Sequence, residues 1–321
     1  MLVATDLGSL ARRPRAVAIG TFDGVHAGHR AVIGAAVVCA RERGLTSAVL
    51  TFDRHPLAVL DASHQPRLLT TRREKIRLIE ELGPEELVVL RFDAPLAALS
   101  PEEFCRDVLA GALDARVVVV GENFTYGAGG RGDADALTRC GKGHGFATIT
   151  VPLVTEAGRP ISSTRIRRLL HDGRLEEVRE VLGRPPSAAG RVVPGLRRGS
   201  TLGVPTANVD VEAGMVFPGR GVYAARACVA GTWYRAAVNI GHNPTFRGRD
   251  EVTAHVTVEA HLLGFAGDIY DRDIRLDFLH KLRDERRFDS VDALVAQMQV
   301  DIASTAGLAD GAFDEVGLGT S

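Results

Sequence analysis

Cysteine is scarce in this chain, which has 4 such residues among 321. No two of them form a C-x-x-C pair, and we expect none to share a metal ion with a nearby histidine. Free thiols are the simple interpretation, because disulfide frameworks belong mainly to secreted proteins. A disulfide scaffold or a zinc site is therefore not expected at Cys39, Cys105, Cys140 or Cys228.

The chain also lacks a strong net charge and a long apolar run. Its formal net charge is -1, so no broad electrostatic attraction to nucleic acid or to an anionic membrane is predicted. No apolar run approaches the ~20 residues that span a bilayer. Residues 1–10 lack the basic start and apolar stretch of a signal peptide. We expect a cytoplasmic protein, with a homo-oligomer as an alternative to a monomer.

The first half of the chain alternates short apolar runs with helical patterns. The runs are β-branched and apolar on both faces, as buried parallel strands are. This alternation predicts an α/β doubly wound, Rossmann-like sheet, with a ligand at the carboxyl ends of its strands near the switch point. Strands are expected over 16–20, 47–52, 87–92, 117–120 and 147–151, and helices near 28–43, 72–82, 101–112 (capped by Ser100) and 132–144.

The pattern changes after about residue 183. The Pro-, Gly- and Ala-rich stretch 182–190 is typical of a linker. Strand signals then dominate, which favours an antiparallel β-sandwich or small barrel. A closing helix begins after Ser290, with an apolar stripe of Val291, Leu294, Val295, Met298 and Ile302. Strands are expected over 221–230, 233–240, 252–262 and 274–279, and the domains over 1–183 and 184–308, before a disordered tail over 309–321.

The segment G-T-F-D-G-V-H-A-G-H (20–29) follows the first of these strands and leads into a helix. The start of a helix directs free backbone N–H groups and partial positive charge at one point, which suits phosphate. His26 and His29 lie three residues apart, so both can face one phosphate from the first helical turn. A lone histidine is more often structural, but two His, three Gly and one Asp within ten residues favour a site.

Ser163 and Thr164 precede Arg165 and Arg167 at the start of another predicted helix. Two hydroxyls followed by basic side chains form a natural phosphate clamp. Plain helix capping by Ser163 or Thr164 is the structural alternative.

The run 20–29 resembles a motif in the nucleotidyltransferase half of bacterial bifunctional riboflavin kinase/FAD synthetases. Three later runs resemble further motifs of that half: T-F-D-R-H-P (51–56), V-G-E-N-F-T-Y-G (120–127) and I-S-S-T-R-I-R (161–167). This resemblance implies transfer of AMP from ATP to the phosphate of FMN, which gives FAD and pyrophosphate, with Mg²⁺ on the ATP phosphates. It implies that ATP binds Gly20, Phe22, Asp23, Gly24, His26, His29, Ser163, Thr164 and Arg167, and that the flavin binds His55 and Asn123.

The second half contains G-S-T-L-G-V-P-T-A-N (199–208), whose P-T-A-N run resembles the hallmark of riboflavin kinases. The segments 238–246, 258–263 and 278–288 resemble the same kinase module and follow in its order. The resemblance implies a six-stranded Greek-key barrel that phosphorylates riboflavin to FMN with ATP. Glu259 would be the general base, where a solvated strand face is the structural alternative. Thr206 and Asn208 would hold Mg²⁺ and, with Gly203, ATP.

The resemblance covers roughly residues 14 to 305, with departures at single positions. Three hypotheses follow: a bifunctional enzyme, a descendant that keeps one activity, and a flavin sensor without turnover. The presence of His26, His29, Thr206, Asn208 and Glu259 favours the first, whereas the departures would suit a paralogue with an altered flavin substrate or a weakened kinase. The departures are Arg54 for Pro, Pro194 for His, Ser200 for a basic residue, Val204 for Phe and Asp271 for Gly.

Overall fold

The computed structural model describes residues 1–195, 203–242 and 256–308. The chain divides into two compact units, Met1–Ser163 and Thr164–Ser321. This division lies before the boundary expected after residue 183, and the helices α7 (Ser163–His171) and α8 (Leu175–Leu182) fill the interval between them. Within the second unit α8 packs on the barrel, where Glu176 accepts a hydrogen bond from His280 at 3.1 Å.

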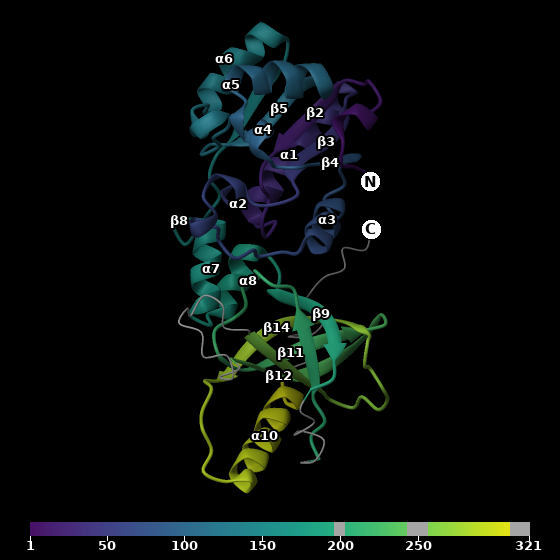
Figure 1. Cartoon of the computed structure of the whole chain (residues 1–321), viewed down its shortest axis with the longest axis vertical. Coiled ribbons are helices and arrows are strands. Elements are labelled where there is room, and N and C mark those ends of the chain that lie inside the picture. Colours follow the sequence, from purple (N-terminus) through teal and green to yellow (C-terminus); the bar gives the residue numbers. More distant parts are fainter. Residues whose placement is uncertain (196–202, 243–255, 309–321) are drawn as a thin grey trace. The chain divides into compact units, whose positions relative to one another are not determined.

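The first unit is built on a six-stranded sheet in the order β1-β4-β3-β2-β5-β6, in which all neighbouring strands are parallel (Figure 1). The predicted doubly wound sheet is confirmed. The edge strand β1 was not predicted. The order reverses between β2 and β5, so the switch point lies there. The strands are β1 (Leu2–Ala4), β2 (Arg15–Ile19), β3 (Thr46–Phe52), β4 (Glu86–Leu90), β5 (Ala115–Gly121) and β6 (Ala147–Val151).

Helices cover both faces of this sheet. Successive residues of a strand point to opposite faces, so each face has its own buried core. On β2, Val17 and Ile19 join one buried core, and Ala16 and Ala18 join the other. Ser100 caps the first turn of α5, as the sequence predicts, and it forms a capping box with Glu103. The helices are α1 (Ala27–Arg43), α2 (Leu57–Leu60), α3 (Arg72–Glu80), α4 (Ala94–Ala98), α5 (Pro101–Glu103), the π-helix η3 (Phe104–Ala112) and α6 (Ala134–His144).

The second unit is a closed antiparallel barrel in the order β10-β13-β12-β11-β14-β9, which confirms the predicted barrel. Of the expected strand 252–262, residues 252–255 lie outside the described residues, as does the expected tail over 309–321. The strands are β9 (Ser187–Val193), β10 (Ala207–Val211), β11 (Gly221–Val229), β12 (Thr232–His242), β13 (Val256–Leu262) and β14 (Asp273–Arg283).

The predicted linker over 182–190 is wrong for most of its length. Helix α8 ends at Leu182 and β9 begins at Ser187, so only four residues connect them. The small residues belong to the barrel because strands approach closely there. A Cβ atom on Gly190 would lie 2.2 Å from the carbonyl oxygen of Asp210 on β10. A composition that is typical of linkers thus reflects tight strand packing.

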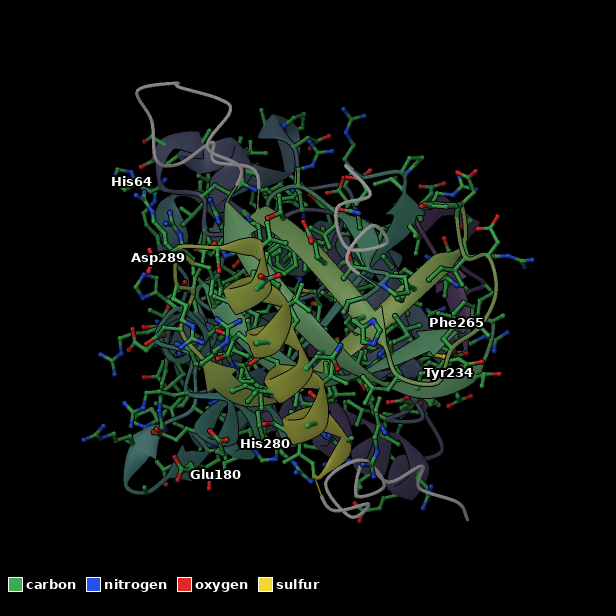
Figure 2. The ribbon with its side chains drawn as sticks, turned by 90° about the horizontal axis from the view of Figure 1, so that it is seen from below. His64, Glu180, Tyr234, Phe265, His280 and Asp289 are labelled. Carbon is green, nitrogen blue, oxygen red and sulfur yellow. The ribbon has the colours of Figure 1, made fainter. Side chains whose placement is uncertain are left out.

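The closing helix α10 (Val291–Ala306) lies against the barrel (Figure 2). It begins at the predicted cap, where the side chain of Ser290 accepts from the N–H of Ala293. The predicted apolar stripe is only partly right, because Val291 is 59% exposed. The buried residues of α10 are polar, and one of them, Asp301, pairs with Arg283 of β14 at 2.7 Å. A partly buried ion pair therefore helps to hold this helix in place.

Candidate functional sites

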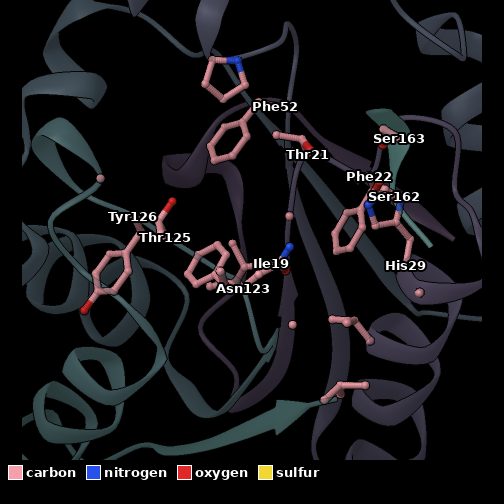
Figure 3. Close-up of a pocket in the computed structure, with 18 of the residues that line it drawn as sticks. Ile19, Thr21, Phe22, His29, Phe52, Asn123, Thr125, Tyr126, Ser162 and Ser163 are labelled. Atoms are coloured by element: carbon pink, nitrogen blue, oxygen red, sulfur yellow. The ribbon is translucent and has the colours of Figure 1, made fainter. Parts of the chain in front are cut away.

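A pocket of about 440 Å³ lies in the first unit at the carboxyl ends of β2 and β5. Ile19 and Gly20 contribute to it from β2 and the loop that follows, and Gly121 contributes from the end of β5. Where the strand order of a parallel sheet reverses, the loops that follow the two neighbouring strands diverge and leave a crevice between them. The pocket occupies the switch point, as the sequence predicts. Figure 3 shows His29 and Ser163 toward one end of it and Tyr126 toward the other.

The loop between β2 and α1 has an unusual backbone. Phe22 and Val25 adopt left-handed φ angles of 48° and 40°, and both side chains are buried. Gly24 has φ 87°, and a Cβ atom there would lie 2.8 Å from Leu69 Cδ1. Left-handed backbone costs a non-glycine residue roughly 1–2 kcal/mol. Such strain persists where the surrounding fold holds it, commonly at functional sites.

Asp23 fastens this loop to the segment before α3. Its buried carboxylate accepts hydrogen bonds from the backbone N–H groups of Leu69 at 2.9 Å and Thr70 at 3.2 Å. Gly24 N–H in turn donates to Thr70 Oγ1 at 3.2 Å. These bonds give Asp23 an anchoring role in the loop, and its expected contact with ATP stays a prediction.

The two histidines come together at the start of α1. His26 is the N-cap of the helix, and its Nδ1 accepts from the backbone N–H of His29 at 3.3 Å. The two imidazole rings are stacked, with centroids 3.5 Å apart, and both line the pocket. Because Nδ1 of His26 accepts a hydrogen bond, the neutral ring carries its proton on Nε2. The first turn of α1 can thus offer an imidazole N–H and backbone N–H groups to a phosphate.

The other end of the pocket is aromatic. The chain has 12 Phe, 4 Tyr and 1 Trp, and six of these residues line this one pocket. Phe52 and Phe92 meet edge to face with ring centroids 5.2 Å apart, and Phe124 and Tyr126 are stacked at 5.7 Å. A flat aromatic ligand suits such a wall. Sequence reasoning missed this wall, although Phe52, Phe124 and Tyr126 lie inside motifs that it singled out.

The remaining predicted residues of the first half are divided between the pocket and its surroundings. Asn123 and Ser163 line the pocket, and Ser163 Oγ donates to the carbonyl oxygen of Asp23 at 2.9 Å. His55 is not among the lining residues, although its neighbour Pro56 is. The Nδ1 atom of His55 accepts from the N–H of Leu57 at 3.2 Å. Thr164 and Arg167 lie on α7 in the second unit, and their contact with ATP stays a prediction.

Two cysteines lie behind the aromatic wall. Cys105 Sγ is 3.4 Å from the hydroxyl of Tyr126. Cys140 and His144 are one turn apart on α6, and both bond to Glu102, at 3.2 Å and 2.6 Å. The sequence argument against a metal site overlooked this pair, because the ligand atoms of Cys140, His144 and Glu102 lie within 4.8 Å of one another. Burial, with Cys105 and Glu102 close by, raises the pKa of the Cys140 thiol. Glu102 thus serves as the hydrogen-bond partner of both Cys140 and His144.

A second polar cluster lies on the barrel. The register pairs Glu259 of β13 with Asn208 of β10 on one side and with Asn239 of β12 on the other. Directly opposed residues in antiparallel strands share a face of the sheet. These three residues therefore form a row across three strands, and each is half-buried. Asn239 was not singled out from the sequence, although it lies in the segment 238–246.

Asn208 is held closely by the end of β9. A Cβ atom on Gly195 would lie 2.0 Å from Asn208 Nδ2, so only glycine leaves room for this amide. Thr206 is half-buried just before β10. Beside it, the carbonyl oxygen of Pro205 is 2.8 Å from His261 Nδ1. Gly203 is exposed with φ 75°. The cluster thus brings Thr206 and Asn208 to the strand that carries Glu259.

The departures from the expected pattern have separate structural settings. Arg54 is exposed and pairs with Asp53 at 2.8 Å. Pro194 is exposed, whereas Val204 is only 1% exposed. Asp271 has φ 59°, a left-handed angle at which glycine is free of strain. Ser200 lies outside the described residues.

Two family models match the chain in succession. The FAD synthetase model matches residues 9–165, and the riboflavin kinase model matches residues 182–308. The chain is 38% identical over 286 residues to a bifunctional riboflavin kinase/FMN adenylyltransferase of Bacillus subtilis, and this covers 89% of each chain. It is 38% identical over 284 residues to the Escherichia coli K12 protein of that name, covering 88% of this chain and 89% of that one.

A solved structure agrees with this assignment of the fold. A crystal structure from Streptococcus pneumoniae, described as a macrolide-efflux protein, is 31% identical with a TM-score of 0.86. The match covers 96% of this chain and 99% of that chain. Among the helices of the described residues, none is long and apolar enough to cross a membrane.

Proposed function

The chain belongs to the bifunctional riboflavin kinase/FMN adenylyltransferase family, and we propose that adenylyl transfer takes place in the pocket at the ends of β2 and β5. The enzyme phosphorylates riboflavin to FMN in its C-terminal half and converts FMN to FAD in its N-terminal half, with ATP as the co-substrate of both reactions. The observation that carries the proposal is the difference between the two ends of this pocket. One end has a helix start with two histidines, and the other has aromatic rings.

Each end of the pocket suits one part of the substrates. The ATP phosphates would lie at the start of α1, near His26, His29, Gly20 and Ser163. The isoalloxazine ring of FMN would lie between the aromatic side chains, with Asn123 at its edge. A phosphate oxygen of FMN attacks the α-phosphorus of ATP, and the bond from that phosphorus to pyrophosphate breaks. The protein has only to position the reactants and neutralise charge, which N–H donors at a helix start do well.

Other residues would extend this site. By the family resemblance, Thr164 and Arg167 would bind the ATP phosphates, and Phe22, Asp23 and Gly24 would shape the loop around them. His55 would approach the flavin. These assignments are supported by the position of each residue beside a motif, and each remains open to substitution tests.

The kinase reaction would use the row of polar residues on the barrel. Glu259 would take the proton from the 5′-hydroxyl of riboflavin as its oxygen attacks the γ-phosphorus of ATP and ADP leaves. Thr206 and Asn208 offer a hydroxyl and an amide oxygen, and Asn208 is paired in register with Glu259. Mg²⁺ prefers such oxygen donors, so these residues fit the ion. Bound Mg²⁺ would neutralise charge on the ATP phosphates, which Gly203 would approach through its backbone.

The setting of the enzyme follows from its substrates. We propose that it works in the cytoplasm on small molecules and binds neither nucleic acid nor membrane. The formal net charge of -1 supports this, because it provides no attraction to polyanions. A homo-oligomer stays an alternative to a monomer, which sedimentation of the purified chain would decide.

Two substitutions test the assignment of sites. Purified variants are incubated with riboflavin, ATP and Mg²⁺, and FMN and FAD are separated by chromatography. Glu259→Gln should abolish FMN formation while added FMN is still converted to FAD. His29→Ala should do the reverse, so that FMN accumulates. We expect a loss of at least 100-fold in each affected reaction.

The wild-type result separates the three hypotheses. FMN and FAD together indicate the bifunctional enzyme, one product indicates a descendant with one activity, and no product indicates a flavin sensor. A kinase rate that is unchanged in Glu259→Gln would show that this carboxylate is not the base.

A further inference from the structure

Lys75 is an unusual cation beside the carboxyl ends of the strands, where the pocket lies. The chain has 39 Lys and Arg residues, of which only Lys75, Lys142 and Lys281 are lysines. Lys75 lies one turn into α3, and its side chain is largely removed from water. Its ammonium donates to the carbonyl oxygens of Phe52 at 2.9 Å and Thr21 at 3.3 Å, and to Thr51 Oγ1 at 3.4 Å. Three donors thus meet three acceptors.

These acceptors belong to two neighbouring parts of the pocket wall. Thr21 lies in the loop after β2 that leads to the two histidines, and Phe52 is the last residue of β3 and part of the aromatic wall. Both are labelled in Figure 3. Thr51 joins them, because its fully buried hydroxyl donates to the carbonyl oxygen of Thr21 at 3.1 Å. One cation therefore ties the loop at the phosphate end to the strand at the aromatic end.

The charge of Lys75 has no direct carboxylate partner among the hydrogen bonds of the described residues. Asp23 and Asp53 attract it from a greater distance, and Arg72 on its own helix repels it. The Asp23 carboxylate is bonded to Leu69 and Thr70, and the Asp53 carboxylate is bonded to Arg54 and to the N–H of Phe92. Burial, opposed only by these distant carboxylates, lowers the pKa of Lys75 to about 8.

We propose that Lys75 is a positioning residue for adenylyl transfer, which sets the distance between the ATP phosphates and the flavin by clamping the Thr21 and Phe52 carbonyls. This inference rests on the proposed function of the pocket. Attack on the α-phosphorus requires FMN and ATP to be held together, and a misplacement of about 1 Å can cost on the order of 100-fold in rate. A clamp between the two binding ends controls that distance directly.

The geometry also explains why a lysine stands here in a chain whose cations are mostly arginines. The three acceptors converge on one nitrogen, and a compact ammonium has three donors on one atom. The donors of a guanidinium are spread over a planar fork and suit a bidentate partner. An arginine would keep the positive charge but could not reach the three oxygens from a single point.

The test compares three variants of the full-length enzyme. Lys75→Met removes the ammonium but keeps most of the apolar stem, and Lys75→Arg keeps the charge. Lys142→Met, at an exposed position on α6, is the control. We expect Lys75→Met to lower kcat for adenylyl transfer by roughly 10- to 100-fold. KM for ATP should change by less than about threefold, while the riboflavin kinase rate of the same protein and the Lys142→Met variant stay at wild-type values.

The pH profile separates positioning from plain structural support. The wild-type adenylyl-transfer rate should fall as the pH rises through about 8, because the clamp loses its proton there. Lys75→Arg should be slower than wild type but keep its rate above pH 8, since arginine stays protonated. Lys75→Met should lack this step. Wild-type turnover in Lys75→Met, or the same step near pH 8 in all three proteins, would overturn the proposal.

Two further measurements keep the outcomes distinct. Hydrogen exchange of the β2 and β5 amides shows whether Lys75→Met still folds, and if it does not, the profile of Lys75→Arg alone decides. His29→Ala is assayed in parallel. If it also leaves adenylyl transfer intact, the proposed site is wrong. If His29→Ala is inactive and Lys75→Met is not, only the role of Lys75 falls.

Discussion

At the scale of single residues, the fold decides which protonation states the pocket can use. His26 accepts a backbone hydrogen bond at Nδ1, so the neutral form of its ring carries the proton on Nε2. Lys75 is partly buried against neutral oxygens, and this desolvation lowers its pKa to about 8. Neither state can be inferred from the residue type, because each depends on a partner from another part of the backbone.

Lys75 should also make the stability of the first unit depend on pH. Its pKa is about 8 in the folded protein and 10.5 for an unperturbed lysine. Between these values the unfolded chain binds a proton that the folded chain does not. The free energy of unfolding should therefore rise with pH across this window, by up to about 3 kcal/mol relative to Lys75→Met. Hydrogen exchange of the β2 amides at pH 7.5 and pH 10 measures this difference.

This prediction sets stability against activity. Over the same pH range the adenylyl-transfer rate should fall while the first unit becomes more stable. An equal change of stability with pH in wild type and in Lys75→Met would show that the lysine is not buried as the structure has it.

At the scale of elements, small residues mark places where strands approach closely. Gly190 lies against the backbone of Asp210, and Gly195 lies against the amide of Asn208. The sequence pattern around them is typical of a linker, because Pro, Gly and Ala are common in linkers as well. Only the pairing of β9 with β10 reveals why these residues are small.

Gly195→Ala should damage the kinase and spare the fold. The new Cβ would lie 2.0 Å from Asn208 Nδ2, so the amide must move, whereas the backbone of β10 need not. We expect kcat of riboflavin phosphorylation to fall on the order of 10- to 100-fold, with adenylyl transfer of added FMN unchanged. Gly34→Ala on α1, where a Cβ would meet nothing within 4 Å, is the matched control and should leave both rates intact.

Asp271→Gly should stabilise the barrel. Asp271 precedes β14 with φ 59°, where glycine has no steric cost. We expect a gain of about 0.5 kcal/mol in the free energy of unfolding. Trp233, on β12, is the only tryptophan of the chain, so its fluorescence during urea unfolding reports on the second unit alone. Asp273→Gly, in strand β14, should lower the stability instead, and a loss of stability in both variants would contradict the prediction.

At the scale of the whole molecule, the residues that line the pocket and the polar row on the barrel belong to different compact units. The residues that line the pocket all precede Thr164, and Asn208, Asn239 and Glu259 all follow it. The two family models follow the same order along the chain. Inactivation of one site should therefore leave the chemistry of the other intact.

A mixture of two inactive proteins should consequently make FAD from riboflavin. His29→Ala alone should stop at FMN, and Glu259→Gln alone should leave riboflavin unchanged. Mixed in equal amounts with ATP and Mg²⁺, the first supplies FMN and the second adenylylates it. Chromatography of the products checks this. A mixture that accumulates FMN without FAD would indicate that FMN made in one chain does not reach the other.

The sequence alone was enough for the alternation of strands and helices, the antiparallel strands of the second half, the caps at Ser100 and Ser290, and the motifs that mark both proposed sites, whereas the choice of a barrel over a sandwich came from the family resemblance. These features depend on local periodicity and on residues close together in the chain. The aromatic wall, the clamp of Lys75, the row from Asn208 through Glu259 to Asn239, and the limits of the linker were decided only by the tertiary structure. Each of them joins residues from separate strands or loops, and local sequence carries no record of register or of burial against a distant segment.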